Sequence, residues 1–216
     1  MVQLRRSIEL SLVAFLFLAG SAFLLKMCYL SLTFNTLFGL AFLGTVYAYV
    51  SVRYALKIPT LLLIFIFLAL QVDALGNHFR MYGQQFGPIQ YDEFSHMSVQ
   101  ALVTPVIVWL LMSLMNNLGY RLPLWLTSFF AATIMFSLAA FYEIIELWDE
   151  LHFDGQRIWG PYDTASDLQW DLLGIVIGCV LATQVLKSKR TAPLMFSNLP
   201  ESFVMREQPK GSSGHS

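Results

Sequence analysis

Apolar runs of about 20 residues, separated by short polar breaks, recur along most of this sequence. A helix of that length crosses the hydrocarbon core of a bilayer, where only helices and closed barrels satisfy their backbone hydrogen bonds. The chain is 12% charged, about half the share found in soluble domains. The sequence therefore predicts an all-α polytopic membrane protein, a bundle of six transmembrane helices over residues 8–28, 34–52, 58–79, 92–114, 124–148 and 167–187.

The two ends of the chain have contrasting compositions. The first apolar run follows Arg5 and Arg6, as in a signal peptide, but it continues to Leu25 and is too long for one, so we interpret it as an uncleaved first helix. Residues 188–216 are polar, with scattered Pro and Gly, and are predicted to be disordered. The expected organisation is a six-helix domain over 1–187, with its motif-bearing part at 70–182, and a tail over 188–216.

Charged residues divide between the two sides of the predicted membrane. The N-terminus, the loops after the second and fourth helices and the C-terminal tail hold ten of the thirteen Lys and Arg residues, so both termini are expected in the cytoplasm. Eleven of the fourteen acids lie at or beyond the outer ends of helices three to six: Asp73, Asp92, Glu93, Glu143, Glu146, Asp149, Glu150, Asp154, Asp163, Asp167 and Asp171. The net charge of −1 indicates no nucleic-acid partner.

Helical spacing places several of these outer groups on shared faces. Asp92 and His96, for example, are four residues apart at the start of the fourth predicted helix. Charges at this depth are costly unless they are paired, protonated or bound to a metal. The residues that we predict as metal ligands, if these faces converge, are His78, Asp92, His96, Glu143, Glu146, Asp167 and Asp171.

Two arrangements would neutralise so many carboxylates beside lipid. Several could stay protonated, or one or two divalent cations could supply the positive charge. Mixed histidine and carboxylate ligation suits Zn, Mn or Fe better than Mg or Ca. Two imidazoles with four carboxylates also match the ligand count of four-helix di-iron sites. We therefore expect a divalent metal ion (Zn, Mn or Fe) as cofactor.

Simpler interpretations exist for some of these features. Asp92 and Asp167 could be N-caps of the fourth and sixth helices. Gly174 and Gly178, four residues apart, predict close helix packing. The 16-residue loop Leu151–Ser166 is long enough to act as a lid over an outer pocket.

Four segments carry a combined pattern: GNHFRMYG (76–83), YDEFSHMSVQAL (91–102), AAFYEIIELW (139–148) and DLQWDLLGIVIGCVL (167–181). Together they resemble the YjdF-like family of small bacterial inner-membrane proteins and, more distantly, the VanZ-like proteins. The sequence departs from the family pattern at Ser95, Met97, Leu147 and Leu168, beside the ionisable positions, which are intact.

The resemblance implies a multi-pass protein of the bacterial inner (plasma) membrane and supports the seven ligand candidates. It also singles out Tyr91, Gln169 and Trp170 as supporting residues. Asp73, deep in the third predicted helix, is expected to support the same cluster or to pair with Arg80. The resemblance implies no particular reaction.

Three functions fit these expectations. One is a metal-dependent enzyme that acts on a lipid or lipid-linked envelope substrate at the outer side, with one carboxylate as general base. Another is a non-catalytic accessory subunit of a larger membrane complex, with a structural acidic cluster. The third, a proton- or ion-coupled transporter, is disfavoured because no acidic relay crosses the membrane. The expected partners are the lipid bilayer and other membrane-protein subunits.

Overall fold

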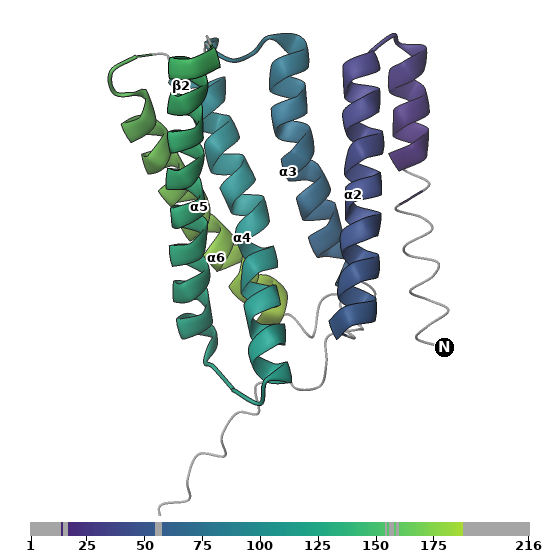
Figure 1. Ribbon diagram of the computed structural model, residues 1–216, viewed down its shortest axis with the longest axis vertical. Helices are drawn as coiled ribbons and strands as arrows, with labels where there is room; N and C mark the ends of the chain where they lie inside the picture. The colour runs from purple at the N-terminus through teal and green to yellow at the C-terminus, as the bar shows by residue number, and fades with distance from the viewer. Residues whose placement is uncertain are drawn as a thin grey trace, which may run out of the picture.

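The computed structural model describes residues 14, 17–54, 58–153, 155, 158 and 160–187, and this part of the chain is nearly all helical (Figure 1). A helix Phe17–Lys26 precedes five long helices and one short hairpin. These elements are α2 (Leu30–Tyr54), α3 (Thr60–Phe79), β1 (Gln85–Phe86), β2 (Ile89–Gln90), α4 (Tyr91–Asn117), α5 (Leu124–Phe153) and α6 (Asp163–Lys187).

Five helices, α2 to α6, are long and apolar enough to cross a membrane. The predicted helical architecture with several membrane spans is thereby confirmed in its coarse form: the described part is nearly all helical and has five candidate spans. The first predicted span, 8–28, is described mainly as the shorter helix Phe17–Lys26, and most of its earlier residues lie outside the described part. The count of six helices and the cytoplasmic location of both termini therefore stay predictions, and the tail 188–216 also lies outside.

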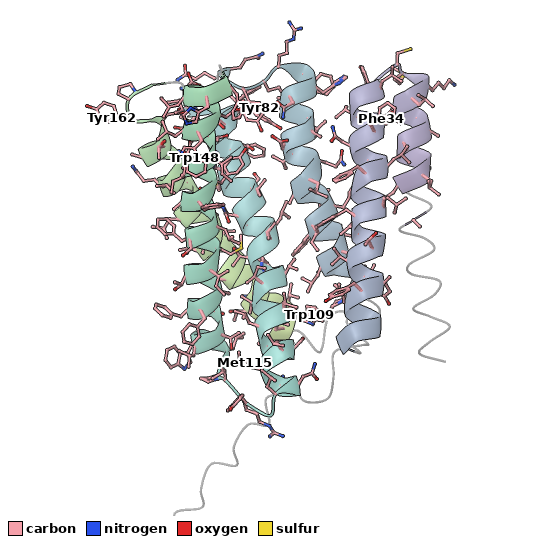
Figure 2. The ribbon with its side chains drawn as sticks, in the orientation of Figure 1. Phe34, Tyr82, Trp109, Met115, Trp148 and Tyr162 are labelled. Atoms are coloured by element: carbon pink, nitrogen blue, oxygen red, sulfur yellow. The ribbon has the colours of Figure 1, made fainter. Side chains whose placement is uncertain are left out.

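Large apolar side chains cover the outside of the bundle. Trp125 is 71% exposed and Phe153 78%, and many Phe, Leu and Ile side chains of α2, α5 and α6 are exposed as well. Figure 2 shows such side chains projecting outward along the full height of the helices. An apolar surface this extensive is unfavourable in water and suits contact with lipid.

α4 occupies the middle of the arrangement, in contact with α3, α5 and α6, while α2 packs on α3. The buried apolar cluster lies toward one end of these helices, where α3 begins and α4 ends. Its members include Leu62, Leu63, Phe67, Val108, Trp109, Leu124, Ala131, Ala182 and Leu186. The opposite end holds the acidic side chains of α3 to α6 and is the top of the molecule in Figure 1; we call it the acidic end.

Two glycines allow α6 to lie very close to α4. A Cβ added to Gly178 would stand 2.6 Å from the Cβ of Thr104, and one added to Gly174 would collide with the backbone carbonyl of Met97. Neither position has room for a side chain, so the prediction of close packing is confirmed. Proline has no backbone N–H, so Pro105 cannot donate the usual helical hydrogen bond to the carbonyl oxygen of Ala101. That oxygen faces α6, 3.0 Å from the position of a Cβ added to Gly178.

Helix boundaries at the acidic end differ from the predicted ones. α6 begins at Asp163, one turn before the predicted residue 167, and α5 continues to Phe153 instead of ending at 148. The carboxylate of Asp163 interacts favourably with the partial positive charge of the α6 N-terminus, which supports the earlier start. The segment between α5 and α6 is consequently shorter than the predicted lid Leu151–Ser166.

The glycine contacts give a first prediction. Gly174→Ala should destabilise the protein by about 1–3 kcal/mol, because the new methyl group meets a backbone carbonyl that cannot rotate away. Gly44→Ala is the matched control, since Gly44 is also helical and a Cβ there meets nothing within 4 Å. Thermal unfolding in detergent measures both. Equal midpoints for the two variants would contradict the close contact.

Candidate metal centre

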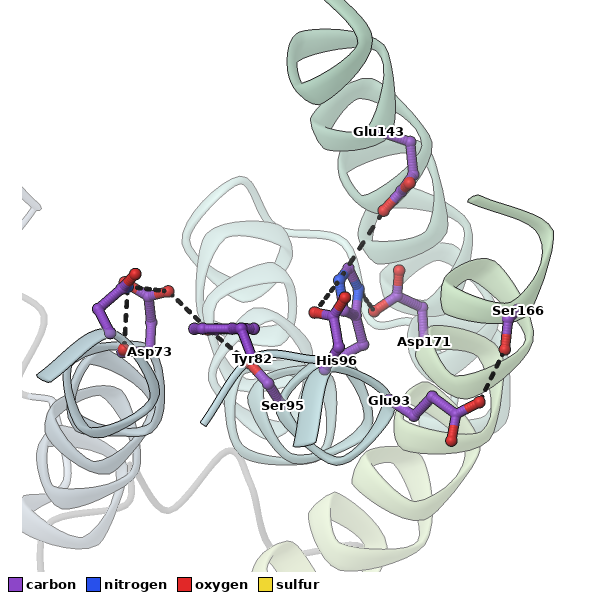
Figure 3. A network of polar contacts seen from close by, with 10 residues as sticks. Asp73, Tyr82, Glu93, Ser95, His96, Glu143, Ser166 and Asp171 are labelled. Atoms are coloured by element: carbon purple, nitrogen blue, oxygen red, sulfur yellow. Dashed lines mark hydrogen bonds and ion pairs between the residues drawn. The ribbon is translucent and has the colours of Figure 1, made fainter. Parts of the chain in front are cut away.

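His96 lies at the centre of the acidic cluster, just over one turn into α4. Its Nδ1 is 3.1 Å from Oδ1 of Asp171 on α6. Its Nε2 faces Oδ1 of Asp92 at 3.7 Å and Oε1 of Glu143 at 3.9 Å. Figure 3 shows Glu143 and Asp171 approaching the ring from α5 and α6. One imidazole thus contacts carboxylates from three helices.

The sequence positions these groups through helix geometry. Asp92 and His96 are four residues apart on α4, so they share a face. Asp167 and Asp171 are likewise four apart on α6, and Asp171 precedes Gly174 by about one turn. Because Gly174 holds α6 against α4, the carboxylates before it are directed toward His96.

Two overlapping sets of ligand atoms, each within 4.8 Å of one another, could hold a metal ion. One set comprises Asp92, His96 and Asp167, and the other His96, Glu143 and Glu146. Ligands bound to one transition-metal ion lie about 3–4 Å apart, so small movements would complete either set. The structure therefore brings together six of the seven predicted ligands, counting Asp171 through its contact with His96.

Three carboxylate oxygens in the cluster are buried without a hydrogen-bond partner. They are Oε1 of Glu143, Oδ2 of Asp167 and Oδ2 of Asp171. These residues are only 5%, 2% and 1% exposed, respectively. A buried polar atom that lacks a partner costs free energy, more so when it carries charge. This donor set fits a divalent cation, which would supply the missing partner.

A cavity of about 710 Å³ opens beside the cluster between α3, α4 and α5. Its polar end is lined by Asp92, His96, Asp171 and further carboxylates, and its other end by apolar side chains. The apolar lining includes Phe38, Ile66, Leu70, Val99, Val103 and Leu138. The cavity is therefore amphipathic, with its polar end next to His96.

Tyr82 connects the far wall of this cavity to α4. Its hydroxyl donates to Oδ1 of Asp73 at 2.8 Å and lies 3.3 Å from the Ser95 hydroxyl (Figure 3). Burial raises the pKa of Tyr82 far above its ordinary value, and the neighbouring Asp73 carboxylate raises it further, so the phenol stays protonated. Gly76 makes room for this arrangement, because a Cβ there would stand 2.6 Å from the Tyr82 ring.

The remaining predicted residues lie in other surroundings. The ring of His78 packs edge-on against Tyr29, with centroids 5.0 Å apart, and belongs to neither set of potential ligands. The Tyr91 hydroxyl donates to the Val72 carbonyl at 2.7 Å, which ties α4 to α3. Gln169 is exposed and bonds the Ala165 carbonyl within α6, and Trp170 is half-buried.

The N-cap interpretation of the two aspartates is wrong. The residue that precedes α4 is Gln90, whose backbone N–H donates to Glu93 Oε2 at 2.9 Å, and Asp92 lies inside the helix. Asp167 is four residues into α6 and buried.

Sequence reasoning missed Ser95, Gln100 and Tyr82 as parts of the site. Gln100 lies four residues after His96, so the spacing that pairs Asp92 with His96 also predicts it. Tyr82 carries no comparable signal, because it lies between α3 and β1.

The fold and the cluster define a multi-pass helical membrane protein with a buried group of one histidine and several carboxylates. The sequence matches the family described as "Predicted membrane protein (DUF2238)" over residues 7–189, and the chain belongs to that family. The match includes the first helices, beyond the range 70–182 of the motif resemblance. The match supports a membrane-protein family, and the narrower YjdF-like and VanZ-like resemblances stay predictions. No curated protein and no solved structure matches the chain.

The unpartnered oxygens give a second prediction. In protein treated with a chelator, Asp167→Asn should raise the free energy of unfolding by about 1 kcal/mol, because it removes a buried carboxylate that lacks a hydrogen-bond partner at Oδ2. Glu93→Gln is the control: Glu93 already accepts hydrogen bonds from Ser166 and Gln90, so its neutralisation should not stabilise. Thermal unfolding of both variants measures this difference. A loss of stability in Asp167→Asn would indicate that the carboxylate is itself structural.

Proposed function

We propose that this chain is a metal-dependent membrane enzyme that acts on a lipid or lipid-linked substrate at the acidic end of the bundle. The observation that carries the proposal is the burial, around one imidazole, of three carboxylate oxygens that lack a hydrogen-bond partner. A divalent cation supplies the positive charge that these oxygens lack. The amphipathic cavity beside them supplies a site for a substrate with a polar head and an apolar chain.

The residues divide into ligands and a supporting group. Nε2 of His96 faces two carboxylates and is the nitrogen ligand, with Asp92, Asp167, Glu143 and Glu146 as oxygen ligands. Asp171 contacts the other ring nitrogen, Nδ1, as a carboxylate that orients a metal-bound histidine does. One imidazole among several carboxylates favours Mn or Fe over Zn, which prefers nitrogen and sulfur ligands.

The bound ion would act as a Lewis acid and lower the pKa of a coordinated water. A carboxylate that is not engaged by the ion is within the same cluster and could accept a proton from that water. The positive-inside prediction places this end of the bundle on the outer side of the bacterial inner membrane. The substrate would then be a component of the cell envelope.

The rival function is that of a non-catalytic subunit whose acidic cluster is purely structural. In that case the protein should fold and assemble without a metal, and loss of His96 should affect assembly alone. A transporter is less well supported, because among the described residues the buried carboxylates are Asp92, Glu143, Asp167 and Asp171, all at the acidic end.

Metal content gives a third prediction. Protein purified in detergent without a polyhistidine tag should contain about one or two equivalents of Mn, Fe or Zn by elemental analysis. His96→Ala and Glu143→Gln should each lower that content at least tenfold while the protein remains folded, because second-shell changes alone cost 10–100-fold in metal affinity.

His152→Ala is the matched control, since it removes an exposed imidazole at the end of α5. This variant should retain the full metal content. Folded wild-type protein that holds no metal, and gains no thermal stability from added Mn²⁺, would refute the metal centre. The structural-subunit function would then be preferred.

A further inference from the structure

The cavity has features that the metal centre does not use. Besides the ligands around His96, its polar end is lined by Asp73 from α3 and Asp149 from α5. The aromatic rings of Tyr82 and Tyr142 line the same end. Carboxylates together with aromatic faces are the groups that recognise an organic ammonium ion, through charge and through cation–π attraction.

A second observation points independently to a ligand. Gln100 is only 8% exposed, lines the cavity, and its Oε1 has no hydrogen-bond partner. It lies one turn, about 6 Å, beyond His96 toward the apolar part of the cavity. A ligand group that donates a hydrogen bond to this oxygen would satisfy it. That group would lie about one helical turn from a polar head held at the acidic end.

The apolar part fixes the shape of the ligand. Beyond Gln100 the lining consists of side chains such as Val103 on α4, Leu138 on α5 and Phe38 on α2. These groups favour an alkyl or prenyl chain by burial of apolar surface. The carboxylates and aromatic rings therefore lie toward the acidic end of the cavity, and the Gln100 amide lies among apolar side chains farther from that end.

We propose that this cavity binds an amphiphile with an ammonium headgroup. The ammonium lies among Asp73, Asp149 and the two tyrosine rings, and the chain extends past Gln100 into the apolar part. Such an amphiphile would be the substrate class of the enzyme proposed above. This inference rests on the proposed function in one respect, that the cavity is the substrate site. A lipid with a phosphate head alone would be repelled by the same carboxylates.

The test compares two probes that share one chain, dodecylamine and dodecyl phosphate. Metal-free wild-type protein in an uncharged detergent is incubated with each, and the retained probe is counted by native mass spectrometry. The detergent competes equally with both probes. Dodecylamine should be retained at least tenfold more than dodecyl phosphate. Placing the negative phosphate of the second probe against the negative carboxylates costs several kcal/mol.

Variants test the location. Asp73→Asn keeps an oxygen that can accept from Tyr82 and should still fold, and it should weaken dodecylamine binding about tenfold. Asp149→Asn should do the same. Glu93→Gln removes a carboxylate from the same end of the bundle but outside the cavity lining, and should leave dodecylamine binding unchanged.

The outcomes separate this proposal from the metal centre. Equal retention of the two probes by wild type, or no retention of dodecylamine, overturns it whether or not the variants fold. Equal losses in Asp73→Asn and Glu93→Gln also overturn it, because the amine would then respond only to overall charge. Because the measurement uses metal-free protein, failure to bind metal leaves the ammonium site standing, and failure here leaves the metal result untouched.

Discussion

The close approach of α6 to α4 is the contact on which the acidic end depends. Gly174 and Gly178 bring the α6 backbone against Met97 and Thr104, with no space for a side chain between them. Side chains of a helix point back toward its N-terminus, so the carboxylates that precede Gly174 extend toward His96. The contact itself contains no ionisable group. The position of a highly charged site is thus decided by the packing of glycine against backbone and threonine.

This arrangement separates the part that stabilises the bundle from the part that carries charge. Val108, Trp109 and their apolar neighbours fill the end away from His96. Burial of ions costs several kcal/mol for each group that is incompletely paired. Asp167 and Asp171 each bury a carboxylate oxygen without a hydrogen-bond partner, and such a burial costs free energy that well-packed apolar side chains would not. The proposed metal ion would offset this cost by giving the buried oxygens a partner.

Five of the six predicted membrane helices and most of the cluster are found in the described part of the chain, because both follow from local rules. Apolar length predicts a span, and spacing by three or four residues predicts which side chains share a face. His78 shows the limit of this reasoning: it is at the right depth, but its ring packs on Tyr29, and spacing cannot decide which way a helix is rotated. Tyr82 shows another limit, since its position depends on the space left by Gly76 on a different element.

The two ends of the polar region suit cations of different size. Ligand atoms around His96 lie within 4.8 Å of one another, the scale of a small, dehydrated metal ion. Asp73 and Asp149 instead face a cavity of about 710 Å³ together with aromatic rings, which suits a larger and weakly hydrated organic cation. If the protein binds both cations as proposed, they would repel each other, and each would lower the affinity for the other by the same factor. If both proposals hold, the ammonium would lie near Asp73 and Asp149, on the side of the cavity away from the metal.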